Sequence, residues 1–148
     1  MKNEPFIIER ILNASVEKVW KAITDKDEMK KWYFDLAEFK PEVGFEFQFY
    51  AGDDKKQWLH ACKVTEVIPE KKLTYSWRYE GYSGISYVTF ELFDEAEETR
   101  LKLTHSDLES FPIDEPGLKK ENFIAGWKMI IGKNLKVFLE SEKNERQS

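Results

Sequence analysis

VEKVWKAITD, residues 16–25, is the stretch that decides the fold of this chain. Its apolar residues recur at helical spacing, which predicts a short amphipathic helix. Ser15 precedes it as a candidate N-cap, and Asp25 is the candidate cap of a second short helix that runs to Trp32. Both helices follow a run of β-branched and aromatic residues over Phe6–Leu12, which predicts a first strand. The chain therefore begins with a strand and a pair of short helices.

The middle of the chain is almost entirely strand-like. Phe45, Phe47 and Phe49 alternate with polar residues, a period of two that is typical of a strand with one buried face. The same alternation, bounded by turn residues, predicts further strands over 57–68, 73–79, 88–92 and 101–105. A short strand is also expected near Phe34–Phe39, which gives six or seven strands in total. Their short connections predict an antiparallel sheet.

A long helix is predicted at the C-terminal end, over Lys119–Glu142. Its apolar face is broad, it contains no proline, and at 1.5 Å per residue it would be about 36 Å long. Gly126 is expected to mark a close approach to the sheet or to the short helices, because glycine otherwise weakens a helix by about 1 kcal/mol. The irregular loop Glu109–Leu118 precedes this helix and contains two prolines and a glycine.

Length and composition predict one domain over residues 1–148, with a core from about 6 to 140. The chain has 28 acidic and 23 basic residues, a net charge of −5, so general nucleic-acid binding is not expected. One cysteine, Cys62, excludes an internal disulfide and fits a reducing compartment. No apolar run is long enough to insert into a membrane. A cytoplasmic protein is therefore expected.

Five motifs stand out along the chain: the Val16–Asp25 run, the pair Trp32-Tyr33, the strand Leu73–Trp77, the strand Thr99–His105 and the pair Gly126-Trp127. Together they resemble the heat-shock-protein-90 ATPase activator homologue family. The family belongs to the SRPBCC superfamily, with START domains and birch-pollen-allergen proteins. The resemblance implies an α+β helix-grip fold, in which a curved antiparallel sheet wraps around the long C-terminal helix and leaves an apolar cavity between them. It leaves function open, because one such scaffold carries many activities.

The inward-facing residues of this sheet and helix form the candidate ligand-binding site. Aromatic residues make up 15% of the chain, and ligand sites are typically apolar with a few polar groups. A filled hydrophobic core is the alternative interpretation, of about equal weight. Trp58 is also expected to face inward, and the Glu109–Leu118 loop is expected to form the entrance. The candidate residues are Phe47, Phe49, Tyr75, Trp77, Val88, Phe90, Leu101, Leu103, His105, Phe123, Trp127, Ile130 and Ile131.

The sequence predicts no catalytic residue, no cofactor and no metal site. His60 and His105 are the only histidines, and with Cys62 they are too few for the three or four ligands that a metal needs. A histidine held by hydrogen bonds in the barrel is favoured over a general base. Cys62 is expected to be an inert thiol, and Arg10 and Arg78 are expected to face solvent.

The sequence is compatible with three functions. The first is a non-enzymatic protein that binds a small hydrophobic molecule between the sheet and the helix. The second, implied by the resemblance, is a co-chaperone that stimulates a heat-shock-protein-90 ATPase as part of a stress response. The first strand begins by Phe6, so a separate chaperone-binding domain is not expected, and little stimulation is expected with it. The third is an enzyme of the cyclase or dehydratase kind.

Overall fold

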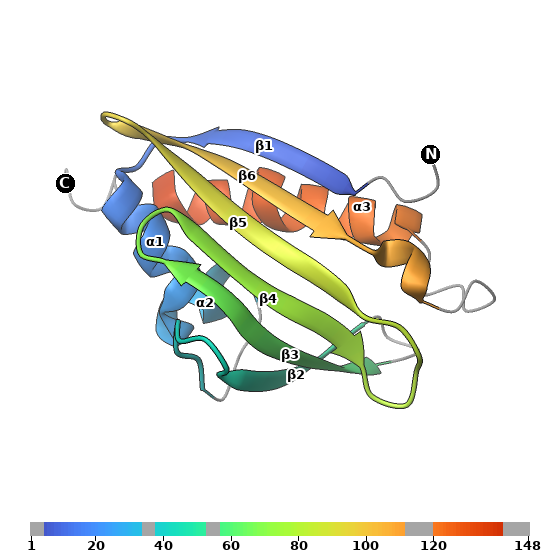
Figure 1. Ribbon diagram of the computed structural model, residues 1–148. Helices are drawn as coiled ribbons and strands as arrows, with labels where there is room; N and C mark the ends of the chain where they lie inside the picture. Colours follow the sequence, from blue (N-terminus) through green and yellow to red (C-terminus); the bar gives the residue numbers. More distant parts are fainter. Residues whose placement is uncertain (1–4, 34–37, 53–56, 112–119, 141–148) are drawn as a thin grey trace.

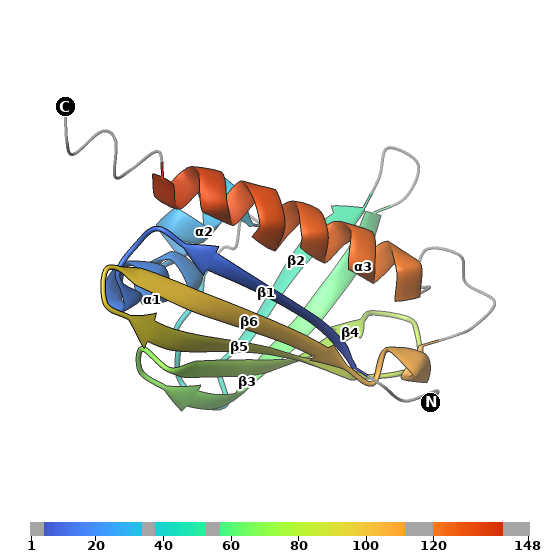
Figure 2. The same cartoon turned by 90° about the horizontal axis from the view of Figure 1, so that it is seen from above.

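The computed structural model describes residues 5–33, 38–52, 57–111 and 120–140. Its centre is an antiparallel six-stranded sheet in the order β1-β6-β5-β4-β3-β2. Figure 1 shows this sheet in front of one long helix, and Figure 2 shows the sheet curving beneath that helix. The fold is therefore α+β and of the helix-grip type, as the sequence predicted. The strands are β1 (Phe6–Leu12), β2 (Glu46–Gly52), β3 (Gln57–Ile68), β4 (Lys72–Tyr79), β5 (Ser86–Glu95) and β6 (Glu98–Ser106).

The first strand lies beside the last strand. β1 pairs with β6 along its whole length, from Phe6 opposite His105 to Leu12 opposite Thr99. The other neighbours follow one another in the chain, so β2 to β6 form a meander. One bulge interrupts the β3–β4 register between Val64 and Glu66. A bulge increases local twist, which helps a sheet to curve.

The two short helices lie where the sequence placed them, at one end of the sheet. In α1 (Val16–Thr24), the Ser15 side chain accepts a hydrogen bond from the Lys18 amide, as an N-cap does. In α2 (Lys26–Trp32), Asp25 accepts from the Asp27 amide at 2.9 Å. The Trp32 indole donates to the Ala22 carbonyl at 2.9 Å and ties the two helices together.

The C-terminal helix runs without a break from Lys120 to Glu140 within the described residues. It comprises α3 (Lys120–Met129), the π-helical segment η3 (Ile130–Leu135) and a last α-helical turn. The expectation for Gly126 was wrong, because among the described residues a Cβ built there meets no atom of the sheet or of the short helices within 4 Å. Phe123 and Trp127 occupy the buried face of the helix, and Gly126 points beside that face into open space.

The expected strand near Phe34–Phe39 is not found in the described residues. Residues 34–37 lie outside the described part of the chain, and Glu38 and Phe39 belong to no strand. The predicted loop Glu109–Leu118 begins with a short 3₁₀ helix, η1 (Leu108–Ser110). Residues 112–119 lie outside the description, so the expected entrance remains a prediction.

Candidate ligand-binding site

Aromatic side chains fill the layer between the sheet and α3. Because successive strand residues point to opposite faces, the alternating aromatics of the strands share the face that the helix covers. Of the thirteen candidate residues, Ile130 on the helix is only partly buried. Trp58 on β3, which was also expected to face inward, is partly buried as well. The other candidates are buried: Phe47, Phe49, Tyr75, Trp77, Val88, Phe90, Leu101, Leu103, His105, Phe123, Trp127 and Ile131.

Trp127 joins the helix to the middle of the sheet. Its ring centroid lies 5.8 Å from that of Trp77 on β4 and 6.3 Å from that of Phe90 on β5. Phe49 on β2 packs edge-on against Trp77 at 5.8 Å. These separations are typical of aromatic pairs in contact. The helix therefore packs along Trp77, as the fold prediction required.

His105 is the centre of a buried hydrogen-bond chain. The Trp127 indole donates to His105 Nδ1 at 2.9 Å, and indole N–H can only donate, so Nδ1 accepts. The neutral ring therefore carries its proton on Nε2, which donates to Ser86 Oγ at 2.7 Å. Ser86 in turn donates to the Trp77 carbonyl at 3.3 Å. Burial lowers the pKa of His105 to about 3, so the ring is neutral with both nitrogens engaged.

A second polar pair lies in the same layer. The hydroxyls of Tyr33 and Tyr75 are 2.6 Å apart, and burial raises the pKa of both far above the ordinary value. Nearby, the Trp77 indole donates to the Tyr79 hydroxyl at 2.9 Å. In the described residues no buried side-chain nitrogen or oxygen lacks a partner. The layer thus combines apolar rings with hydroxyl and N–H groups that satisfy one another.

The two histidines flank one tryptophan. The Trp77 centroid lies 5.0 Å from the His60 ring and 5.4 Å from the His105 ring. His60 also stacks on Phe49 at 4.5 Å, and its Nδ1 lies 2.9 Å from the Trp58 carbonyl oxygen. Burial lowers the pKa of His60 to about 4. Both histidines are therefore packed into the barrel in their neutral form.

The remaining residues singled out in the sequence are Cys62, Arg10 and Arg78. Cys62 is buried, and burial raises the pKa of its thiol, which makes the reactive thiolate scarce. Arg10 and Arg78 are exposed, as expected. Among the described residues, no three histidine, cysteine or carboxylate side chains converge as a metal site would require. The same part of the chain holds no helix both long and apolar enough to span a bilayer.

Tyr33, Tyr79 and Ser86 are among the residues of the layer that were absent from the candidate list. Tyr33 belongs to the Trp32-Tyr33 motif but was not assigned to the interior. Tyr79 lies two residues after Trp77 on the same strand, so the alternation of strand residues already predicted that it faces inward. Ser86 shares parity with Val88 but is small and polar, and the hydrophobic pattern gives it no signal.

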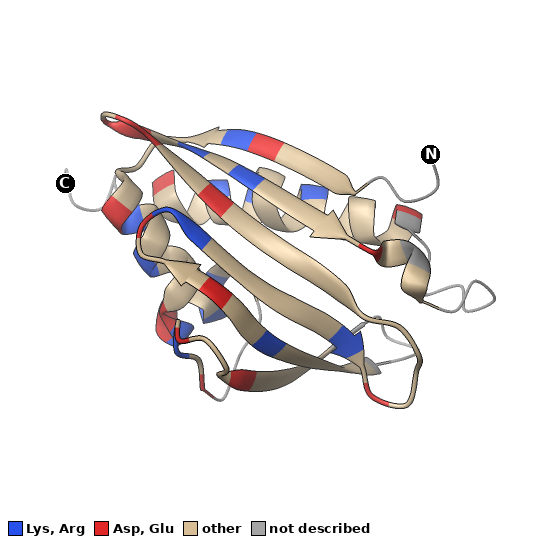
Figure 3. Ribbon diagram, in the orientation of Figure 1, with Lys and Arg blue, Asp and Glu red and all other residues tan. Residues whose placement is uncertain are grey.

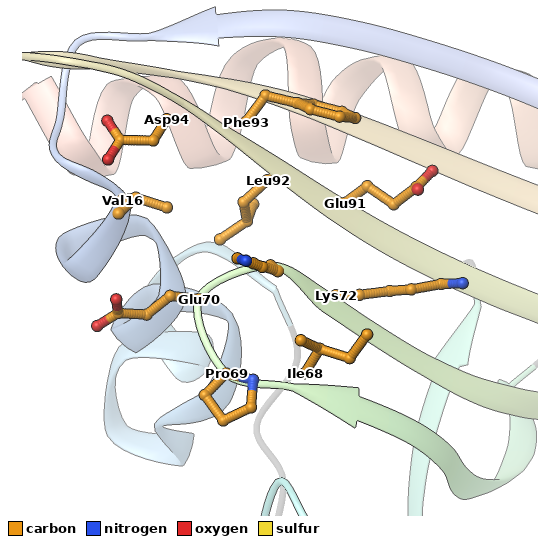
Figure 4. Close-up of a pocket in the computed structure, with 10 residues that line it drawn as sticks. Val16, Ile68, Pro69, Glu70, Lys72, Glu91, Leu92, Phe93 and Asp94 are labelled. Atoms are coloured by element: carbon orange, nitrogen blue, oxygen red, sulfur yellow. The ribbon is translucent and has the colours of Figure 1, made fainter.

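A separate concavity lies on the outside of the molecule. Figure 4 shows its side chains coming from Val16 at the start of α1, from the β3–β4 turn and from Glu91–Asp94 on β5. Its volume is about 540 Å³, and its charged residues carry both signs. Lys72, one of them, is paired with Glu66 at 3.1 Å. Figure 3 shows the same interleaving of positive and negative residues along the strands. The lining of this concavity therefore does not favour a ligand of one particular charge.

The family of the chain follows from its sequence. The model of a family described as "Activator of Hsp90 ATPase homolog 1-like protein" matches residues 13–140. The chain belongs to this family. No curated protein matches it.

Solved structures of similar proteins share the fold of this family member. DynU16, from the dynemicin biosynthetic locus, has 24% identity and a TM-score of 0.76 over 95% of this chain. The match covers 48% of DynU16, so the chain spans about half the length of that protein. Mll3558 from Rhizobium loti has 20% identity and a TM-score of 0.80, over 93% of this chain and 97% of its own. MLL2253 from Mesorhizobium loti has 26% identity and a TM-score of 0.74, over 93% and 98%.

Proposed function

We propose that this protein binds a small apolar or aromatic molecule between the sheet and α3. The observation that carries the proposal is the layer itself, in which aromatic rings surround hydroxyl and N–H groups that bond to one another, as Trp127 does to His105 and Tyr33 does to Tyr75. Ligand sites are built in this way, with apolar walls and a few polar groups that fix orientation. The lining residues are the thirteen candidates named from the sequence, together with Tyr33, Tyr79 and Ser86.

The protonation states in the layer favour binding over acid–base catalysis. A general acid or base works best with a pKa near the working pH. His105 and His60 have pKa values lowered to about 3 and 4, and the pKa values of Tyr33 and Tyr75 are raised far above neutrality. Each group therefore holds one protonation state near pH 7. This argues against the cyclase or dehydratase alternative.

An apolar dye provides a test of the proposal. ANS should bind the folded protein with saturable fluorescence, and Trp127→Ala should change its affinity about fivefold or more, since that ring is a wall of the layer. Met129→Ala is the matched control, because Met129 lies on the same helix and is 52% exposed. Each variant is first checked for cooperative unfolding. Absence of dye binding, or equal affinity in both variants, would argue for a filled core instead.

A co-chaperone activity is the second candidate, favoured by the description of the family. Such an activity needs an exposed docking patch. The large exposed apolar residues of the described chain are spread over separate elements, with Ile7 and Ile11 on β1, Tyr50 on β2 and Met129 on α3. Since β1 and β2 are opposite edges of the sheet, Ile7 and Ile11 do not form one patch with Tyr50.

We therefore expect little or no stimulation of a heat-shock-protein-90 ATPase by this protein. The measurement is ATP hydrolysis by the chaperone of the same cell, with and without micromolar protein. A several-fold increase would place the co-chaperone function ahead of ligand binding.

A further inference from the structure

Tyr33 occupies the ligand layer but comes from neither of its walls. It follows Trp32, the last residue of α2, a helix of only seven residues. Its ring lies 6.1 Å from Trp127 on the helix side, with a 20° angle between the planes, and 6.2 Å from Phe49 on the sheet side. A side chain from the short helix pair therefore fills the space between sheet and helix.

The hydroxyl of Tyr33 bonds to a buried hydroxyl. Tyr75 is 1% exposed, and within the described chain its hydroxyl bonds only to that of Tyr33, at 2.6 Å. A buried hydroxyl without a partner is costly, so Tyr33 cannot leave unless another polar group takes its place. The position beside Tyr75 therefore requires an oxygen or nitrogen.

We propose that Tyr33 is a built-in substitute for the ligand, and that the ligand is a neutral, flat aromatic ring with a hydroxyl group. This inference rests on the proposed function and names the class of molecule bound. The ligand ring takes the place of the Tyr33 ring between Trp127 and Phe49, and its hydroxyl replaces the Tyr33 hydroxyl on Tyr75. Binding would turn the Tyr33 side chain toward solvent, a move that starts from a residue already partly exposed, while its backbone N–H stays bonded to the Met29 carbonyl at 2.7 Å.

The surroundings of Tyr75 select a neutral group over a charged one. Its ring is enclosed by Phe47 at 5.1 Å, Phe90 at 6.0 Å and Trp77 at 6.5 Å. Arg78 is exposed, and the exposed Arg10 lies against Gly132 of the helix, 3.5 Å from a Cβ built there. An anion enclosed by these rings would lose its hydration, which is strongly unfavourable. Carboxylates of the same shape are therefore expected to bind poorly.

The test uses a cavity made by Tyr33→Ala and two small molecules that differ by one hydroxyl. 4-Methylphenol reproduces the tyrosine side chain, and toluene lacks the oxygen. The variant should bind 4-methylphenol about tenfold or more tightly than it binds toluene, measured by calorimetry, since toluene leaves Tyr75 unpaired. The wild-type protein and Tyr50→Ala should bind 4-methylphenol more weakly than the variant does. Tyr50 is the matched control because it is 67% exposed.

Tyr75→Phe, added to Tyr33→Ala, should remove the preference for 4-methylphenol. Where Tyr33→Ala alone does not fold, Tyr33→Phe retains the ring and loses only the competing hydroxyl. It should then bind 4-methylphenol several-fold more tightly than the wild type, and an unchanged affinity would overturn the proposal.

Three further results would also overturn it: equal affinity for the two molecules, no binding by a folded Tyr33→Ala, or a preference that survives Tyr75→Phe. The proposed function is tested separately by the dye. Saturable dye binding that depends on Trp127, together with any of these three results, would leave ligand binding in place and remove the phenol-like ligand.

Discussion

Acidification from pH 7.5 to pH 5 is expected to lower the free energy of unfolding by about 4 kcal/mol. His105 and His60 have native pKa values of about 3 and 4, against an ordinary value of 6.5. Between pH 6.5 and these native pKa values, both histidines bind a proton in the unfolded chain and stay neutral in the folded protein. The free energy of unfolding therefore falls as the pH falls. Each histidine contributes about 1.4 kcal/mol per pH unit below 6.5. The contribution is complete above pH 6.5 and absent below the native pKa values.

Urea unfolding at several pH values measures this effect. His105→Gln is the informative variant, because a carboxamide can still accept from Trp127 and donate to Ser86 but does not titrate. It should remove about half of the pH dependence, and His60→Gln should remove much of the rest. A stability that is flat between pH 7.5 and pH 5 would show that the histidines are not held in the neutral form.

Trp127→Ala is expected to lower the free energy of unfolding at neutral pH by about 3–5 kcal/mol. The substitution removes the ring contacts with Trp77 and Phe90 and leaves a cavity between the helix and the sheet. It also removes the donor to His105 Nδ1, which leaves a buried acceptor unpaired. Both losses act on the same buried layer, so the effect should lie at the upper end for a core residue.

Two further variants separate these causes. Met129→Ala, two residues away on the exposed side of the helix, should change stability by less than about 0.5 kcal/mol. Trp127→Phe keeps an aromatic ring and loses the N–H donor. Its loss of free energy of unfolding should therefore lie between those of Met129→Ala and Trp127→Ala. A Trp127→Ala variant as stable as Met129→Ala would mean that the helix does not pack on the sheet through this ring.

The regular parts of the fold were predictable because local patterns encode them. Period-two alternation identified which residues of β2 and β4 face inward, and the first strand was predicted with its observed bounds, Phe6–Leu12. Cap chemistry placed the starts of α1 and α2 at Ser15 and Asp25. The spacing of apolar residues also marked the buried face of the C-terminal helix. Each of these signals lies within a few residues of the structure that it predicts.

The polar chemistry of the site was not predictable in the same way. The bond between Tyr33 and Tyr75 joins residues 42 positions apart, and the bond between Ser86 and His105 joins residues 19 apart. Such pairs depend on strand register and on how the helix pair docks, which no local period encodes. The π-helical turn at Ile130–Leu135 likewise leaves the apolar spacing almost unchanged. Gly126 was misread because a glycine can mark open space as well as close contact.

Entry of a small molecule into the layer between the sheet and α3 should change the indole N–H signals of the tryptophans that lie there. Trp127 and Trp77 donate within the layer, whereas the Trp32 indole donates to the Ala22 carbonyl between the short helices. The three signals are assigned with single Trp→Phe variants and followed in nitrogen-15 NMR spectra during titration of the wild-type protein with 4-methylphenol and with ANS. We expect saturable shifts of the Trp127 and Trp77 signals with at least one of these molecules, and a Trp32 signal that stays in place. Unmoved Trp127 and Trp77 signals at saturating concentrations of both molecules would contradict entry into this layer.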